Sequence, residues 1–286
     1  MSTYRVAKQT LHHQGRERSF QIVAPTELSP GAPVLLYFHG SRQSANVSRS
    51  FTAHTFDDLA ERSGALIVYP EGVERHFNDA REGLTESART LGIDDVGFTR
   101  ALIDHLSHTY RIDTSRVFAA GYSNGGQMVI RLLHDAPELL AGAATLAAPV
   151  PVGDNLLDSS LAAPVVPRKV LIMHGTGDPI VPYQGGPAGT PATGIRGYVR
   201  SAPASAEYFA TRNGITAPPT RSVPAPGIAV DTWAAPGREP VQLWTLAGVG
   251  HVVPAPKSLP ATLGATTGQL IAADVIAEFF GLRSRG

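Results

Sequence analysis

One five-residue stretch, Gly-Tyr-Ser-Asn-Gly at positions 121–125, constrains the fold of this chain more than any other feature. Residues 116–120 before it are β-branched, aromatic and small, which is typical of a short buried strand. The residues after it begin a helical run that includes Met128 and Ile130. A serine at such a strand-to-helix turn has an exposed hydroxyl and the positive end of a helix beneath it. The two glycines fit this turn, because a Cβ at either position would clash where the strand and the helix converge. The stretch therefore predicts Ser123 as a candidate nucleophile.

Strand-like and helix-like segments alternate along the rest of the chain, which indicates an α/β sheet. The predicted strands are 19–24, 34–39, 66–69, 117–122, 142–146, 169–174 and 241–246, and the predicted helices are 52–62, 95–110, 123–134, 204–213 and 269–280. No repeat or shift in composition marks a boundary, so we expect a single catalytic domain over residues 1–286. Three segments rich in proline, glycine and alanine break the pattern, at about 147–167, 179–203 and 216–240. We expect them to be long loops that rim a site.

Composition excludes several classes of function. The chain has no cysteine, which rules out disulfides, thiol catalysis and thiolate metal sites. Its formal net charge is zero and it has no basic stripe with interleaved aromatic residues, so we do not expect a nucleic-acid partner. No stretch approaches the roughly 18 apolar residues of a membrane span, so we expect no membrane partner either. Residues 1–14 lack the apolar core of a secretory signal, which favours a cytoplasmic protein unless a leader has been removed. The sequence leaves the oligomeric state open.

Two further strand ends supply the base and the acid that a serine nucleophile needs. Asp178 follows the predicted strand 169–174 after a glycine turn, and His251 follows the predicted strand 241–246 after another. Because the carboxyl ends of parallel strands meet at one edge of a sheet, we expect these side chains to converge on Ser123. The order Ser, Asp, His along the chain is the order found in α/β-hydrolases.

A fourth strand end, after residues 34–39, predicts the place where negative charge is stabilised. The backbone N–H groups of Ser41 and of Asn124, next to the nucleophile, are positioned to hold a developing oxyanion. Losing one such donor typically costs about 3 kcal/mol of transition-state stabilisation, so we expect this turn to be rigid.

These motifs together resemble those of the α/β-hydrolase esterases that include poly(3-hydroxybutyrate) depolymerases and feruloyl esterases. The matching runs are Phe-His-Gly-Ser-Arg-Gln-Ser-Ala at 38–45, Tyr-Pro-Glu-Gly at 69–72, His-Phe-Asn-Asp at 76–79, Asp-Asp-Val-Gly-Phe at 94–98, Gly-Tyr-Ser-Asn-Gly-Gly-Gln-Met at 121–128, His-Gly-Thr-Gly-Asp-Pro-Ile-Val-Pro-Tyr at 174–183 and Gly-Val-Gly-His at 248–251. They fall in the family's order over residues 15–280. The resemblance implies an α/β-hydrolase fold, with a mostly parallel central sheet and helices on both faces. It also implies hydrolysis of carboxylic esters through an acyl-enzyme, without a cofactor or a metal. By similarity, Ser123 is the nucleophile, Asp178 the acid and His251 the base.

Departures from the family's pattern concern the substrate more than the chemistry. Phe77 stands where the family often has tryptophan, and Val-Val-Pro at 252–254 follows His251 where the family often has an aromatic residue. No segment resembles a polymer-binding module, so we expect a soluble ester or a short 3-hydroxyalkanoate oligomer as substrate. The candidate substrate-binding residues are Arg42, His76, Phe77, Asn78 and Tyr183.

Alternatives remain for single residues and for the function. Arg42 is either a solvated charge or an anion clamp, and His76 either faces solvent or contacts substrate. Asn78 either orders its own loop or contacts a ligand. We expect His39 and His174 to be structural and to pack beneath the site. The alternative functions are a serine peptidase or another acyl-transfer enzyme on the same three side chains, and a non-catalytic ligand-binding relative.

Overall fold

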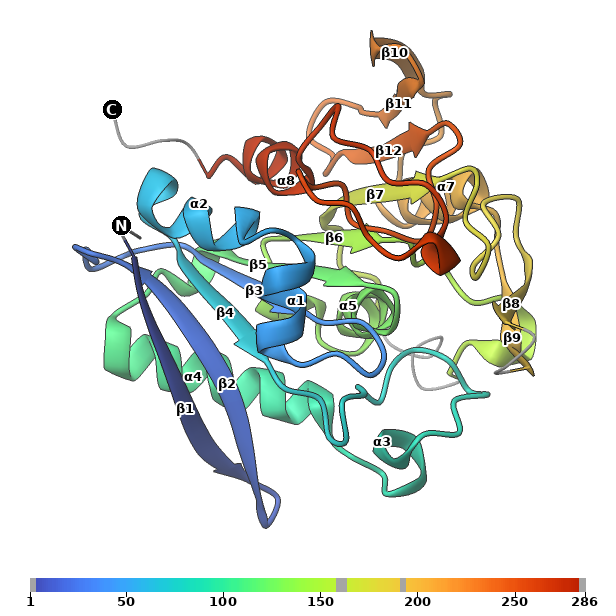
Figure 1. Ribbon diagram of the computed structural model, residues 1–286. Coiled ribbons are helices and arrows are strands. Elements are labelled where there is room, and N and C mark those ends of the chain that lie inside the picture. Colours follow the sequence, from blue (N-terminus) through green and yellow to red (C-terminus); the bar gives the residue numbers. More distant parts are fainter. Residues whose placement is uncertain (1–3, 158–163, 191–193, 283–286) are drawn as a thin grey trace.

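The computed structural model describes residues 4–157, 164–190 and 194–282. A ten-stranded sheet runs through the molecule in the order β1-β2-β4-β3-β5-β6-β7-β12-β11-β10 (Figure 1). Its six central strands are parallel: β4 (Leu66–Pro70), β3 (Val34–Phe38), β5 (Val117–Tyr122), β6 (Gly142–Leu146), β7 (Lys169–Gly175) and β12 (Val241–Leu246). Antiparallel strands extend both edges: β1 (Tyr4–His13) and β2 (Arg16–Pro25) on one side, and β11 (Ile228–Trp233) and β10 (Thr220–Ala225) on the other.

Helices cover both faces of this sheet, because successive side chains along each parallel strand point alternately into two apolar cores. Along β3, Leu36 and Phe38 point into one core, whereas Leu35 and Tyr37 point into the other. The first core is closed by α4 (Asp95–Tyr110), α5 (Asn124–Asp135) and α7 (Ala202–Arg212). The second is closed by α1 (Ala45–Phe51), α2 (Thr55–Ser63) and α8 (Ala272–Phe280). The predicted fold, a mostly parallel sheet with helices on both faces, is confirmed.

The helix α4 shows how local sequence fixes these elements. Phe98, Leu102 and Leu106 recur every four residues and are buried, which gives the helix one apolar face. The side chain of Asp94 accepts a hydrogen bond from the backbone N–H of Gly97 and so caps the helix start. The remaining short elements are α3 (Ser87–Thr90), η1 (Thr114–Arg116), η2 (Pro137–Leu139), η3 (Gly153–Asn155) and η4 (Ala261–Leu263). None of the described helices combines the length and the apolar character that crossing a membrane requires.

Two of the three segments expected to be loops contain strands, so that prediction was wrong for them. Segment 179–203 holds β8 (Gly186–Thr190) and β9 (Gly194–Val199), which form a separate two-stranded sheet. Segment 216–240 holds β10 and β11, which continue the main sheet. Glycine and proline make both pairs of strands hard to recognise in the sequence, because neither residue favours regular strand. The register shifts between Pro187 and Gly189 in one hairpin, and between Ser222 and Ala225 around a proline in the other. Segment 147–167 contains only η3 among its described residues, as expected.

Candidate active site

Ser123 occupies the turn between β5 and α5 in a strained conformation. Its φ is 54° and its ψ is −117°, which a non-glycine residue rarely adopts and which costs about 1–3 kcal/mol. The flanking glycines permit the turn. A Cβ on Gly121 would lie 2.2 Å from the carbonyl oxygen of Gly125, and one on Gly125 would lie 2.1 Å from that of Phe38. Both atoms are backbone and cannot move aside, so the predicted need for glycine at these positions is confirmed.

The three side chains expected to converge form one hydrogen-bonded line, which we call the triad line: Ser123, His251 and Asp178. The His251 Nε2 atom lies 2.9 Å from the Ser123 Oγ, and its Nδ1 lies 2.7 Å from the Asp178 Oδ2. Because a carboxylate only accepts hydrogen bonds, Nδ1 carries the proton and Nε2 is left to accept the serine hydroxyl. The line therefore presents a base to the candidate nucleophile in the tautomer that proton transfer requires.

Asp178 is fixed in place and kept ionised by four hydrogen bonds. Its Oδ1 accepts from the backbone N–H groups of Ile180 and Val181, each at 2.8 Å. Its Oδ2 accepts from His251 and, at 3.1 Å, from the Nε2 of His174. Burial acts to raise the pKa of Asp178, but the hydrogen bonds from His174 and His251 outweigh it and hold that pKa well below its usual range. The expectation that His174 packs beneath the site as a structural residue agrees with this contact.

The turn after β3 is held by a buried, neutral histidine. The His39 Nε2 accepts a hydrogen bond from the backbone N–H of Gly72 at 3.0 Å, so its Nδ1 donates to the Gly40 carbonyl at 2.8 Å. Burial lowers the pKa of His39 to about 4, which keeps the ring uncharged at neutral pH. Within the described ranges, the backbone N–H groups of Ser41 and Asn124 donate to no protein acceptor. Two free amides beside Ser123 are what an oxyanion site needs.

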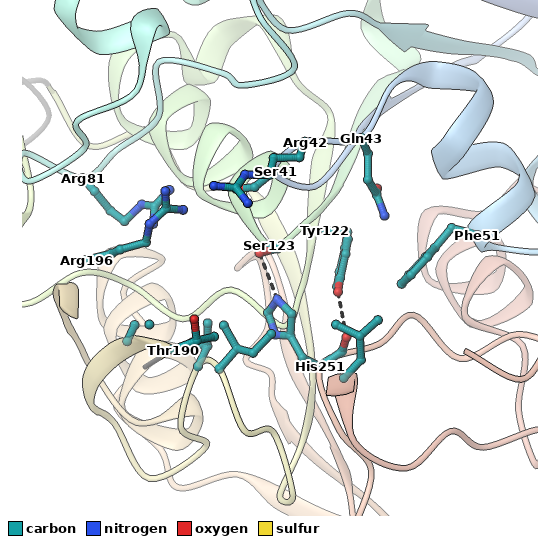
Figure 2. A pocket seen from close by; sticks show the side chains of 15 residues that line it. Ser41, Arg42, Gln43, Phe51, Arg81, Tyr122, Ser123, Thr190, Arg196 and His251 are labelled. Atoms are coloured by element: carbon teal, nitrogen blue, oxygen red, sulfur yellow. Dashed lines mark hydrogen bonds between the residues drawn. The ribbon is translucent and has the colours of Figure 1, made fainter. Parts of the chain in front are cut away.

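The triad line opens into a cavity of about 240 Å³. Figure 2 shows two unlike sides around Ser123: Arg42, Arg81 and Arg196 lie on one, and Tyr122 and Phe51 lie on the other. The further lining residues are Ser41, Gln43, Ile180, Val181, Ala188, Gly189, Thr190, His251 and Leu263. Over the part of the chain that the structure describes, no group of three or more metal-ligating side chains lies together.

Of the predicted substrate contacts, Arg42 lines the cavity and the other four do not. Phe77 is fully buried and packs against His39, with ring centroids 4.6 Å apart. Asn78 is buried as well and donates from its Nδ2 to the Ile93 carbonyl at 2.7 Å. The side chains of these two residues contact the scaffold and do not line the cavity.

Tyr183 and His76 contact other parts of the protein and are not among the residues that line the cavity. The Tyr183 hydroxyl lies 2.7 Å from the Thr245 Oγ1, and its ring packs edge-on against His174. The His76 Nδ1 lies 3.1 Å from the Glu74 carbonyl oxygen, and its ring is nearly buried. No sequence motif singled out Arg81, Arg196 or Phe51, which do line the cavity. Tyr122 lines it as well, and it appeared in the sequence only as the neighbour of Ser123 in the 121–125 motif.

Comparison with known proteins identifies the family of this chain. A family model described as phospholipase/carboxylesterase matches residues 87–192. The putative esterase NocK of Nocardia uniformis subsp. tsuyamanensis is 31% identical over 287 residues, covering 93% of this chain and 79% of that protein. The chain belongs to the α/β-hydrolase esterases. This esterase is also 28% identical over 226 residues to feruloyl esterase B of Piromyces equi, covering 77% of this chain and 39% of that protein. Its fold is similar to that of an acetyl xylan esterase from Aspergillus awamori, with a TM-score of 0.67, 17% identity, and coverage of 96% of this chain and 99% of that one.

Proposed function

We propose that this esterase hydrolyses carboxylic esters through an acyl-enzyme formed on Ser123. The observation that carries the proposal is the triad line, in which one imidazole lies within hydrogen-bonding distance of both the hydroxyl and the carboxylate. An unbroken line of this kind supports an enzyme over a non-catalytic binding relative, because a binding protein has no need to orient a base toward a serine.

The proposed reaction proceeds in two halves. His251 takes the Ser123 proton while the hydroxyl oxygen attacks the ester carbonyl, and Asp178 stabilises the imidazolium that forms. The backbone N–H groups of Ser41 and Asn124 hold the oxyanion of the tetrahedral intermediate. His251 then protonates the leaving alcohol. In the second half, His251 activates a water molecule, which releases the acid and regenerates the serine.

The size of the cavity favours a small substrate. Its volume of about 240 Å³ is below the roughly 300–1,000 Å³ of pockets that enclose drug-sized ligands. A soluble ester or one end of a short 3-hydroxyalkanoate oligomer fits such a space. A wide, flat surface for a solid polymer is not part of the cavity that the described residues form around Ser123.

Replacing the nucleophile tests this proposal. Ser123→Ala should lower turnover of 4-nitrophenyl butyrate by several orders of magnitude, because only the oxyanion site and substrate binding would remain. The melting temperature should change little, since alanine keeps the backbone turn. Ser222→Ala, an exposed serine on β10, is the matched control and should keep full activity. Turnover that persists in Ser123→Ala would remove this residue from the proposed role.

A further inference from the structure

Three arginine side chains from distant parts of the chain meet on one side of Ser123, and we call them the arginine side. Arg42 comes from the turn after β3, Arg81 from the loop after β4, and Arg196 from β9. Figure 2 shows their guanidinium groups near one another and facing the space above Ser123. Nothing in the proposed ester chemistry needs three cations beside the nucleophile.

The carboxylates nearby do not balance these charges. Arg81 forms an ion pair with Asp79, its Nε lying 3.1 Å and 3.2 Å from the two carboxylate oxygens. Arg196 forms an ion pair with Glu86. Arg42 has no carboxylate within ion-pairing distance in the described ranges, and its guanidinium donates no hydrogen bond there. One positive charge is therefore in excess at the mouth of the cavity.

Free hydrogen-bond donors accompany this excess charge. The carboxylate of Asp79 accepts hydrogen bonds from the Nε and Nη2 of Arg81 and, at 2.6 Å, from the Asn124 side chain. Its oxygens therefore have no capacity left for a further arginine. The Nη1 of Arg81 makes no hydrogen bond to a described residue. Arg42 leaves all its guanidinium N–H groups free. A planar guanidinium with free N–H groups recognises a carboxylate through two parallel hydrogen bonds.

The electrostatic environment around the three arginines favours binding of an anion. Burial lowers the pKa of Arg196, and the positive charges of Arg81 and Arg42 lower it further. Burial also lowers the pKa of His76 behind them, with the same three arginines contributing. Mutual repulsion of this kind is relieved when a negative group binds between the cations.

The opposite side of the cavity offers no charge. The rings of Phe51 and Tyr122 lie with centroids 5.1 Å apart and planes tilted by 30°. The Tyr122 hydroxyl is already used, because it donates to the His251 carbonyl at 2.7 Å. A ligand across Ser123 thus meets cations on one side and aromatic faces on the other.

We propose that the preferred substrates are esters that also carry a free, ionised carboxylate group, held by Arg42 together with Arg81 and Arg196. The inference rests on the proposed ester hydrolysis and names its substrate class. Hydrolysis itself is unchanged: water is added across the ester C–O bond, the alcohol leaves, and the new acid releases one proton. The free carboxylate that the substrate already carries takes no part in bond breaking and serves only to hold the substrate.

Paired substrates that differ in one charge test this directly. In one pair, 4-acetoxybenzoate and 4-acetoxybenzamide, the carboxylate is on the alcohol part. In the other, the mono-4-nitrophenyl ester of adipic acid and its terminal amide, the carboxylate is on the acyl part. In at least one pair we expect kcat/KM to be about tenfold or more higher for the anion than for the amide. Raising the salt to about 0.5 M should reduce this preference, because the arginine side is partly exposed.

Variants then assign the preference to the arginine side. Arg42→Gln should cut the ratio of the two kcat/KM values by about fivefold or more, since a neutral amide cannot replace the free guanidinium. Its folding should be unaffected, because this side chain is exposed and makes no internal bond. Arg196→Gln should act in the same direction. The control is Arg116→Gln, which removes the same charge from an exposed residue at the opposite end of β5 and should leave the ratio unchanged.

The outcomes separate this inference from the function on which it rests. If the neutral amide esters are hydrolysed but neither anion is preferred, the carboxylate inference is overturned and the ester hydrolase stands. The same holds if the preference survives both Arg42→Gln and Arg196→Gln. If no ester in either pair is hydrolysed, the proposed function itself is overturned.

Discussion

Asp178 and Arg42 serve the same cavity but are held in very different ways. Asp178 is buried and its carboxylate accepts four hydrogen bonds, two of them from backbone N–H groups. Arg42 is exposed, and its side chain contacts no charged partner in the described part of the chain. The triad line is thus built on the ends of β5, β7 and β12, whereas the arginine side is built on turns and on a glycine-rich hairpin.

This contrast separates the chemistry from the choice of substrate. Residues at the ends of packed strands keep a fixed geometry, which proton transfer over hydrogen-bonding distances requires. Residues on loops can differ among relatives without disturbing that geometry, so they set specificity. Changes to the triad line should therefore affect all esters alike, and changes to the arginine side should affect only the ranking of esters.

Asp178→Asn should give the largest effect. Asparagine would present an N–H group toward Nδ1 of His251, which favours the tautomer with the proton on Nε2 and leaves no acceptor for the Ser123 hydroxyl. The loss in kcat should be about four orders of magnitude, as in other Ser-His-Asp hydrolases. Steady-state kinetics on both members of a charged and neutral ester pair should show equal losses. If the ratio of the kcat/KM values for the charged and the neutral ester changed in this variant, the triad line would also influence the choice of substrate.

Acid should destabilise the fold by protonating two buried histidines. Burial lowers the pKa of both His39 and His134 to about 4 in the folded chain, from an ordinary value of 6.5. Between these two pH values the unfolded chain binds more protons, so the free energy of unfolding falls as the pH falls. Each histidine contributes at most about 3 kcal/mol to this loss. Asp178, whose pKa is lowered, adds a further loss only below its ordinary value of 3.8.

Urea unfolding at several pH values from about 6.5 to about 4 measures this slope. His134→Leu should give a shallower slope than the parent chain, because one of the two buried histidines is gone and the cavity is untouched. An unfolding free energy that stays constant over this range would contradict the neutral, buried state assigned to His39 and His134.

Tyr122→Phe should give the smallest effect. The change removes the hydroxyl that donates to the His251 carbonyl but keeps the ring that lines the cavity. We expect a stability loss of about 1 kcal/mol and a decrease in kcat of no more than about tenfold. Tyr37→Phe is the matched control, since its buried hydroxyl has no hydrogen-bond partner among the described residues and its removal should cost little. Equal losses in the two variants would show that the hydroxyl of Tyr122 has no special place beside the triad line.

The fold and the triad line could be predicted from sequence because their signals are local. Each of Ser123, Asp178 and His251 follows a buried apolar strand and a glycine turn, and parallel strands bring their ends to one edge. The strand β1 was missed because its residues are mostly exposed at the sheet edge and lack an apolar run. The helix α1 was missed because it is only seven residues long, too short to show a helical repeat of apolar residues.

The walls of the cavity could not be predicted because long-range packing places them. Arg81 is oriented by Asp79, a buried carboxylate whose pairing the sequence does not reveal. Arg196 lies on β9, in a segment whose glycines gave the pattern of a loop. Phe77 and Asn78 belong to a recognisable motif, but the motif supports the turn from behind and does not reach the cavity. A motif thus identified the neighbourhood of the site without revealing which side chains face substrate.

Covalent labelling with a serine-directed sulfonyl fluoride measures whether Ser123 is a nucleophile activated by His251 and Asp178, and it does so without assuming a substrate. We expect one adduct per chain, located on Ser123 by peptide mass spectrometry, absent in Ser123→Ala and formed far more slowly in Asp178→Asn. An adduct on another residue, or an unlabelled chain that still hydrolyses esters in the presence of the reagent, would contradict this role of Ser123.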